Sequence, residues 1–190
     1  MEMSGEQHIP LPQQRVWEAL NDPEILKACI PGCESIDRVS DNEYKVALTA
    51  AIGPVKAKFS GKLLLSDINP PNSYSLAFEG SGGAAGFGKG GAQVSLSAKD
   101  GGTLLTYKAT ASVGGKLAQI GSRLIEGVAK KMSDDFFARF NKTVAPAAEA
   151  INQAKTAQQP SNGPTKFAVP VWAWVGGGIL VLLILLYLAR

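Results

Sequence analysis

The sequence predicts an α+β fold in which a curved antiparallel sheet wraps on one long C-terminal helix, followed by one C-terminal transmembrane helix. Three observations lead to this prediction. Apolar and polar residues alternate through much of residues 43–109, which is the period of a sheet with one wet face. From residue 117 apolar residues recur every three or four positions, as on an amphipathic helix. Residues 167–189 contain no Asp, Glu, Lys or Arg.

The chain opens with weak alternation over residues 2–9, which predicts a first strand. Pro10 and Pro12 introduce a short helix over residues 13–20. Asn21-Asp22-Pro23 ends it and starts a second short helix. An antiparallel meander of about six strands follows, with its clearest alternation at residues 44–52, 55–65, 74–78, 94–98 and 105–109.

One face of the strand at residues 55–65 carries Lys56, Lys58 and Lys62. A solvated sheet face accounts for this row of lysines. A docking patch for anionic lipid or an acidic partner is the alternative, and the sequence leaves both open.

The long helix should cover the dry side of the sheet, because no other element is large enough to do so. Its stripe from Leu117 to Phe140 predicts roughly 28 helical residues. A curved sheet wrapped over one helix leaves a concave space, so we expect an apolar cavity between them. We assign residues 1–144 to this ligand-binding domain. Residues 145–166, rich in Ala, Gln, Pro, Ser and Asn, are expected to form a flexible linker.

Residues 167–190 are expected to form a single-pass membrane anchor. About 23 apolar residues span roughly 34 Å as a helix, enough for a hydrocarbon core of about 30 Å. Trp172, Trp174 and Tyr187 lie where aromatic rings favour the membrane boundary. Residues 1–7 lack the apolar segment of a secretory signal. We therefore expect the anchor in the inner (plasma) membrane, with the N-terminal domain cytoplasmic.

Composition argues against several functions. The formal charge of +3 is too mild to indicate a nucleic-acid partner. Cys29 and Cys33, with the distant His8, do not complete a zinc site, and a disulfide is not expected in a reducing cytoplasm. No acid, base or nucleophile is visibly placed for catalysis, so we expect a protein that is not an enzyme, without a metal site.

Residues 80–92 contain seven glycines in thirteen residues. Two phosphate-binding patterns fit them only in part. Gly90 stands where a P-loop needs Ser or Thr, and a strand follows where a G-x-G-x-x-G site needs a helix N-terminus. The segment is either a glycine-softened hairpin or a mobile gate at the cavity mouth, with Phe87 as an apolar plug.

Several ungapped segments closely resemble the G-subunit family of carbon monoxide dehydrogenase. They include Ala28-Cys-Ile-Pro-Gly-Cys-Glu34, Gly53-Pro-Val-Lys-Ala57, Gly82-Gly-Ala-Ala-Gly-Phe87 and the run from Val113 to Phe137, besides Asn21-Asp22-Pro23. The resemblance covers about residues 1–141. It implies a START-like (SRPBCC superfamily) helix-grip fold, which typically binds lipophilic molecules between sheet and helix.

The resemblance also implies a partner, a molybdenum-containing hydroxylase such as aerobic carbon monoxide dehydrogenase, which the chain would bring to the lipid bilayer. A role in quinone delivery follows, with menaquinone or ubiquinone as the bound lipophilic small molecule and no covalent cofactor. A pure recruitment or maturation adaptor without ligand transfer is the alternative. The apolar residues expected to line the cavity are Phe59, Leu63, Leu76, Phe78, Phe87, Tyr107, Leu117, Ile120, Leu124, Val128 and Met132.

Overall fold

One seven-stranded antiparallel sheet carries the structure, a computed structural model that describes residues 1–157. The strands lie in the order β1-β7-β6-β5-β4-β3-β2, so only the β1–β7 pairing joins strands distant in sequence. The strands are β1 (Glu2–Ile9), β2 (Cys33–Ser40), β3 (Glu43–Ile52), β4 (Val55–Asn69), β5 (Ser73–Ser81), β6 (Phe87–Lys99) and β7 (Gly102–Gly114).

The helices sit between these strands and after them. Two short helices, α1 (Gln13–Leu20) and α2 (Pro23–Cys29), separate β1 from β2 as predicted, and Asp22 caps α2 by accepting from the Glu24 amide at 2.9 Å. The 3₁₀ turn η1 (Gly83–Ala85) joins β5 to β6. After β7 come the short α3 (Lys116–Gln119) and the long α4 (Ser122–Ala157).

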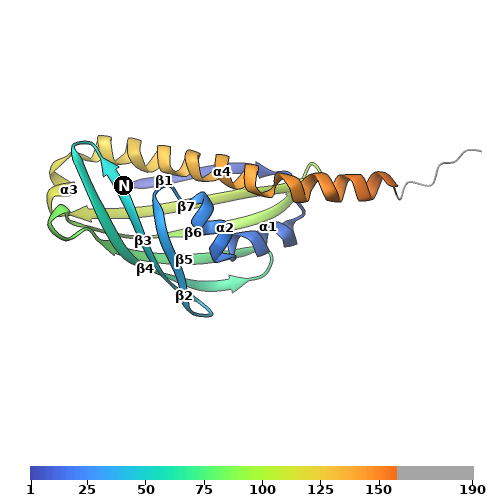
Figure 1. Ribbon diagram of the computed structural model, residues 1–190, viewed down its shortest axis with the longest axis horizontal. Helices are drawn as coiled ribbons and strands as arrows, with labels where there is room; N and C mark the ends of the chain where they lie inside the picture. Colours follow the sequence, from blue (N-terminus) through green and yellow to red (C-terminus); the bar gives the residue numbers. More distant parts are fainter. Residues whose placement is uncertain (158–190) are drawn as a thin grey trace, which may run out of the picture. The chain divides into compact units, whose positions relative to one another are not determined.

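The sheet curves around α4, which lies along its concave side (Figure 1). The α+β expectation is thus confirmed for the sheet and its covering helix, an arrangement consistent with a helix-grip fold. The alternating faces predicted from the sequence are also present. Val46 and Leu48 of β3, with Phe59 and Leu63 of β4, face α4, while the lysines between them face outward.

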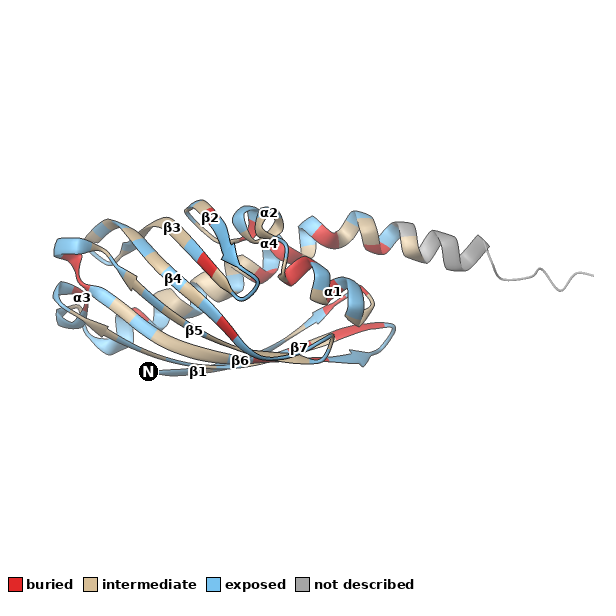
Figure 2. Ribbon diagram, turned by 90° about the horizontal axis from the view of Figure 1, so that it is seen from below, coloured by how far each residue is buried: buried red, intermediate tan, exposed pale blue. Residues whose placement is uncertain are grey.

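The solid part of the core lies where α1 and α2 meet the sheet and the second half of α4. Phe140 and Val16 are fully buried there, together with Ile9 and Cys29. A smaller cluster of Ile36, Tyr44 and Leu65 adjoins it, and Tyr74 contacts both clusters. Buried residues are concentrated toward this half of α4, as the red segments of Figure 2 show.

The long helix differs from its predicted bounds at both ends. Gly121 has φ +97°, which breaks the helix, so α4 begins at Ser122 instead of continuing from Leu117. At its C-terminal end α4 runs through Pro146 to Ala157. Val144 and Ala148 are buried in the main core, so the apolar stripe continues in smaller residues that the composition concealed.

The predicted linker therefore begins too early, because residues 145–157 are helical and the boundary after residue 144 lies inside α4. Residues 158–166 and the predicted anchor at 167–190 lie outside the described residues. Within residues 1–157, no helix combines the length and the apolar composition needed to cross a membrane.

Truncation measures what the end of α4 contributes. A fragment ending at Asn141 loses Val144 and Ala148 from the core, which should cost about 2–4 kcal/mol. Its thermal midpoint should lie about 5–15 °C below that of a fragment ending at Ala157. Equal midpoints in differential scanning calorimetry would show that α4 beyond Asn141 is not part of the core.

Tyr74, which contacts both core clusters, should make the free energy of unfolding fall at alkaline pH. Burial raises the pKa of Tyr74 to about 12, and the neighbouring Tyr44 contributes to the increase. The pKa of Tyr74 in the folded protein lies above the ordinary value of about 10. The stabilisation of the fold by the protonated Tyr74 is therefore fully present below about pH 10. About 2–3 kcal/mol should be lost as pH rises from 10 to 12. Urea titrations across this range should show a correspondingly smaller loss for Tyr74→Phe; equal slopes would contradict the assignment.

Candidate functional site

A cavity of about 500 Å³ lies between the sheet and the first half of α4. It is within the size range of small-molecule sites. Its floor consists of inward-facing positions on β3 to β7, and its roof consists of Leu117, Ile125, Val128, Ala129 and Met132. The lining is almost wholly apolar, so the space suits a lipophilic guest.

Missing side chains create the floor. Val46 pairs with Gly61, Gly61 with Gly80, Gly80 with Gly88, and Gly88 with Val113, so three glycines stand side by side across the sheet. All three contribute to the cavity lining. Inward positions elsewhere in these strands carry Phe59, Leu63 or Phe78. The glycine row leaves empty the space that side chains of that size would fill.

The glycines of the floor differ in whether the backbone around them leaves room for a side chain. A Cβ at Gly88 would lie 3.8 Å from its nearest neighbours and one at Gly80 3.6 Å, both ordinary contacts. A Cβ at Gly61 would lie 2.7 Å from the Glu79 carbonyl oxygen. At Gly90, in the next row, it would overlap the Thr110 carbonyl oxygen. Gly61 and Gly90 thus permit close backbone packing, whereas Gly80 and Gly88 have room for a side chain and leave it empty.

The cavity ends where α4 turns from small and flexible side chains to aromatic ones. Beyond Met132, Phe136, Phe137 and Phe140 fill the helix face. Tyr107 stacks on Phe137 with ring centroids 5.8 Å apart, and its hydroxyl lies 2.9 Å from Ser133 Oγ. These contacts order the half of the core that adjoins the cavity.

The cavity offers little chemistry beyond apolar contact. Lys62, Glu79 and Lys89 border it, but they alternate with the inward positions and belong to the other face of the sheet. Burial raises the pKa of the Cys29 and Cys33 thiols, which keeps them protonated at neutral pH. Among residues 1–157, no cluster of His, Cys, Asp and Glu could hold a metal ion.

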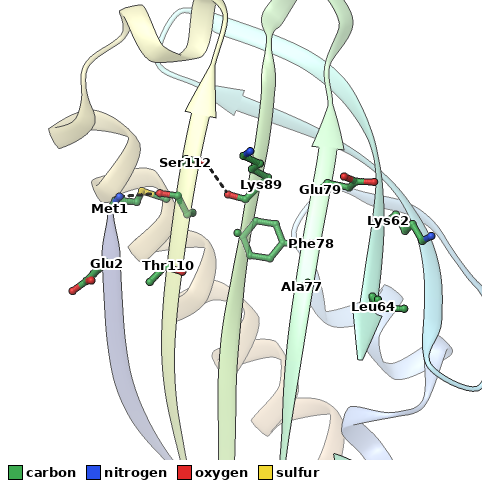
Figure 3. Close-up of a pocket in the computed structure, with 12 residues that line it drawn as sticks. Met1, Glu2, Lys62, Leu64, Ala77, Phe78, Glu79, Lys89, Thr110 and Ser112 are labelled. Atoms are coloured by element: carbon green, nitrogen blue, oxygen red, sulfur yellow. Dashed lines mark hydrogen bonds between the residues drawn. The ribbon is translucent and has the colours of Figure 1, made fainter. Parts of the chain in front are cut away.

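A separate hollow lies on the outward face of the sheet (Figure 3). Lys62, Glu79 and Lys89 come from neighbouring strands there, and Ser112 donates to the Lys89 carbonyl at 3.5 Å. Its mixture of charges and apolar atoms is less suited to a lipophilic guest than the inner cavity.

Six of the eleven predicted site residues line the inner cavity: Phe59, Leu63, Phe78, Leu117, Val128 and Met132. The other five do not line it. Leu76 packs on the Ile36–Tyr44–Leu65 cluster, and Tyr107 packs on the main core. Ile120 lies beside Gly53 in the β3–β4 turn.

Leu124 and Phe87 are the clearest differences from the prediction. Leu124 is 44% exposed at the edge of the apolar stripe, whereas the next residue, Ile125, is buried and lines the cavity. Phe87 is 51% exposed and faces outward over Gly114, so it does not plug the cavity. Most of the glycine segment belongs to the paired strands β5 and β6, as the hairpin interpretation predicted.

The sequence reasoning missed the glycine row and several apolar lining residues. Aligning β4, β5 and β6 in register would have placed Gly61, Gly80 and Gly88 together. The alternation in β3 already put Val46, Leu48, Ala50 and Ile52 on one face. Ile125 and Ala129 adjoin Val128 on the helix face, but the predicted stripe passed through Leu124 and Val128 and left both out.

The family model for the G subunit (CoxG) of carbon monoxide dehydrogenase matches residues 5–145. The chain belongs to this family. Membership associates this CoxG-family chain with carbon monoxide dehydrogenase. The family and its structural neighbours have the fold of binding and accessory proteins and are not a catalytic family.

Several solved structures are similar to the chain. The chain is 37% identical to a conserved protein from Geobacillus kaustophilus, with a TM-score of 0.73 over 77% of this chain and 97% of that one. A Mycobacterium smegmatis protein (14% identity, TM-score 0.59, 77% and 92% covered) and a Thermus thermophilus protein (18%, 0.59, 77% and 99%) share the fold. No curated protein is detectably similar to the chain.

Alanine substitutions test the two kinds of glycine. Gly88→Ala should change the free energy of unfolding by less than about 1 kcal/mol, because its Cβ has room and the unfolded chain loses freedom. Gly90→Ala should destabilise by about 2 kcal/mol or more, because its Cβ overlaps backbone. Equal effects in urea unfolding would contradict the geometry of the floor.

Proposed function

We propose that the chain is a membrane-anchored binding protein that holds a quinone in the inner cavity. It would recruit a molybdenum hydroxylase such as carbon monoxide dehydrogenase to the membrane and link that enzyme to the quinone pool. The observation that supports this best is the glycine-floored apolar cavity of about 500 Å³. Family membership supports the enzyme partner.

A quinone suits this space for physical reasons. Its ring is flat and largely apolar, and its carbonyls need no charged partner. Burying roughly 300 Å² of apolar ligand surface contributes roughly 7 kcal/mol before the costs of association. The cavity has room for the headgroup and the first part of an isoprenoid tail. Menaquinone and ubiquinone both meet these requirements.

The membrane part of the proposal rests on residues 167–190. Their composition supports a C-terminal anchor in the inner membrane, which would leave the binding domain cytoplasmic. Such a tether would keep the protein at the bilayer, where quinones reside.

A recruitment adaptor without ligand transfer is the second candidate. It is favoured by the scarcity of polar groups facing into the cavity, since nothing among residues 1–157 is evidently placed to orient a redox headgroup. In that case the cavity would be a structural remnant and only surface contacts would matter.

Ligand extraction separates the two functions. Mass spectrometry of an organic extract from detergent-purified full-length protein should reveal a quinone. With menaquinone at about 100 times its Kd, the gain of about 2.7 kcal/mol should raise the thermal midpoint by about 5–10 °C. Absence of both signals would rule out the carrier and leave the adaptor standing.

A side chain placed on the cavity floor should block this effect. Gly88→Leu projects into the free space, whereas Lys89→Leu places the same side chain on the outward face. We expect Gly88→Leu to fold but to lose the menaquinone-induced rise in thermal midpoint, and Lys89→Leu to keep it. An undiminished rise in Gly88→Leu would place the ligand elsewhere.

A further inference from the structure

One end of the domain is basic and apolar at once. Three segments meet there: the β3–β4 turn, η1 with the start of β6, and the α3–α4 junction. A Cβ at Gly53 would lie 3.2 Å from Leu124, and one at Gly115 2.7 Å from Gly86 Cα, so the segments are in contact. They lie together beside α3 in Figure 1. The exposed residues that define this basic tip are Lys56, Lys116, Arg123, Pro54, Phe87 and Leu124.

The charge of the tip is not compensated locally. Residues 50–60, 80–90 and 113–125 contain no Asp or Glu. Lys56, Lys116 and Arg123 take part in none of the ion pairs formed within residues 1–157. Glu126 is the first acidic residue along α4. The formal charge of the entire chain is +3. The three basic residues of the tip account for all of it, so the acidic and basic residues of the rest of the chain balance.

The apolar residues distinguish this end from other exposed surface. Phe87 and Leu124 are 51% and 44% exposed beside the basic groups. Met1, Val39, Leu64 and Ile68 are exposed as well, but each has an acidic neighbour in the sequence or on the paired strand: Glu2, Asp41, Glu43 and Asp67. Apolar contact area rimmed by uncompensated positive charge is suited to an acidic surface with its own apolar centre.

The length of the chain limits which surface the tip can reach. α4 starts at the tip, and the helix from Ser122 to Ala154 extends about 50 Å at about 1.5 Å per residue. Residues 155–166 precede the proposed anchor and reach about 40 Å at most, even when fully extended. With the tip pointed directly at the bilayer, the chain would therefore be too short to insert its anchor. The length of the tether therefore argues against the tip lying squarely on the lipid.

We propose that the basic tip docks on an acidic protein surface of the carbon monoxide dehydrogenase that the chain accompanies. The cavity end then faces the enzyme, while the C-terminal end leads to the membrane. This inference rests on the proposed partner and anchor, and it adds the surface that makes the contact.

Charge reversal with a matched control tests the surface. The full-length protein in nanodiscs is measured for binding to purified carbon monoxide dehydrogenase by biolayer interferometry at low and high salt. The triple variant Lys56→Glu, Lys116→Glu, Arg123→Glu should bind at least about 30-fold more weakly, since like charges then face each other. Lys99→Glu, Lys108→Glu, Lys142→Glu changes the net charge equally away from the tip and should stay within about threefold. Unchanged thermal midpoints confirm folding.

A photo-cross-linking residue introduced at the exposed Ser122 identifies the occupant directly. Cross-links to the enzyme support the proposal, and they should disappear in the tip variant. Cross-links to phosphatidylglycerol in its place would make the tip a lipid-binding surface and overturn the proposal. If the native protein binds the enzyme and the tip variant binds equally well, the docking site is wrong while the proposed function stands. No binding of the native protein to the enzyme would reject the partner itself.

Discussion

The site depends on a run of cross-strand neighbours that have no side chains. Gly61, Gly80 and Gly88 stand next to one another on the concave face, and the strands on either side continue the row with Val46 and Val113. Hydrogen-bonded pairing holds the backbone of the floor in place, and the solid half of the core holds α4 above it. A cavity in this fold is therefore maintained by the stiffness of the sheet and by the residues that α4 presents to it.

Stability and binding are divided along the length of α4. Its second half packs aromatic residues and small aliphatic ones against α1 and the sheet, forming a solid core. Its first half presents Ile125, Val128 and Met132 over the empty floor. Because the solid half fixes the helix, the hollow half can remain unfilled. This division lets a binding protein keep an apolar space without losing its fold.

Much of this architecture could be predicted from the sequence, and particular residues show where prediction failed. Alternation in β3 and β4 gave the correct faces, and both short helices were correctly placed. The start of α4 was not, because the positive φ of Gly121 is invisible to a count of apolar spacings. The continuation to Ala157 was missed because the composition of residues 145–166 resembles a linker and the buried residue Ala148 is small. The glycine row depends on register across three strands, which no single segment contains.

The most direct test of the cavity is a methyl NMR titration with menadione, a quinone headgroup without an isoprenoid tail. Perturbations concentrated at Ile125, Val128, Met132 and Leu48 are expected, since their methyl groups surround the floor. Methyl groups of the solid core, such as those of Val16 and Val144, should scarcely shift. Perturbations confined to the outward face of the sheet, or none at saturating menadione, would contradict the assignment of this cavity as the ligand site.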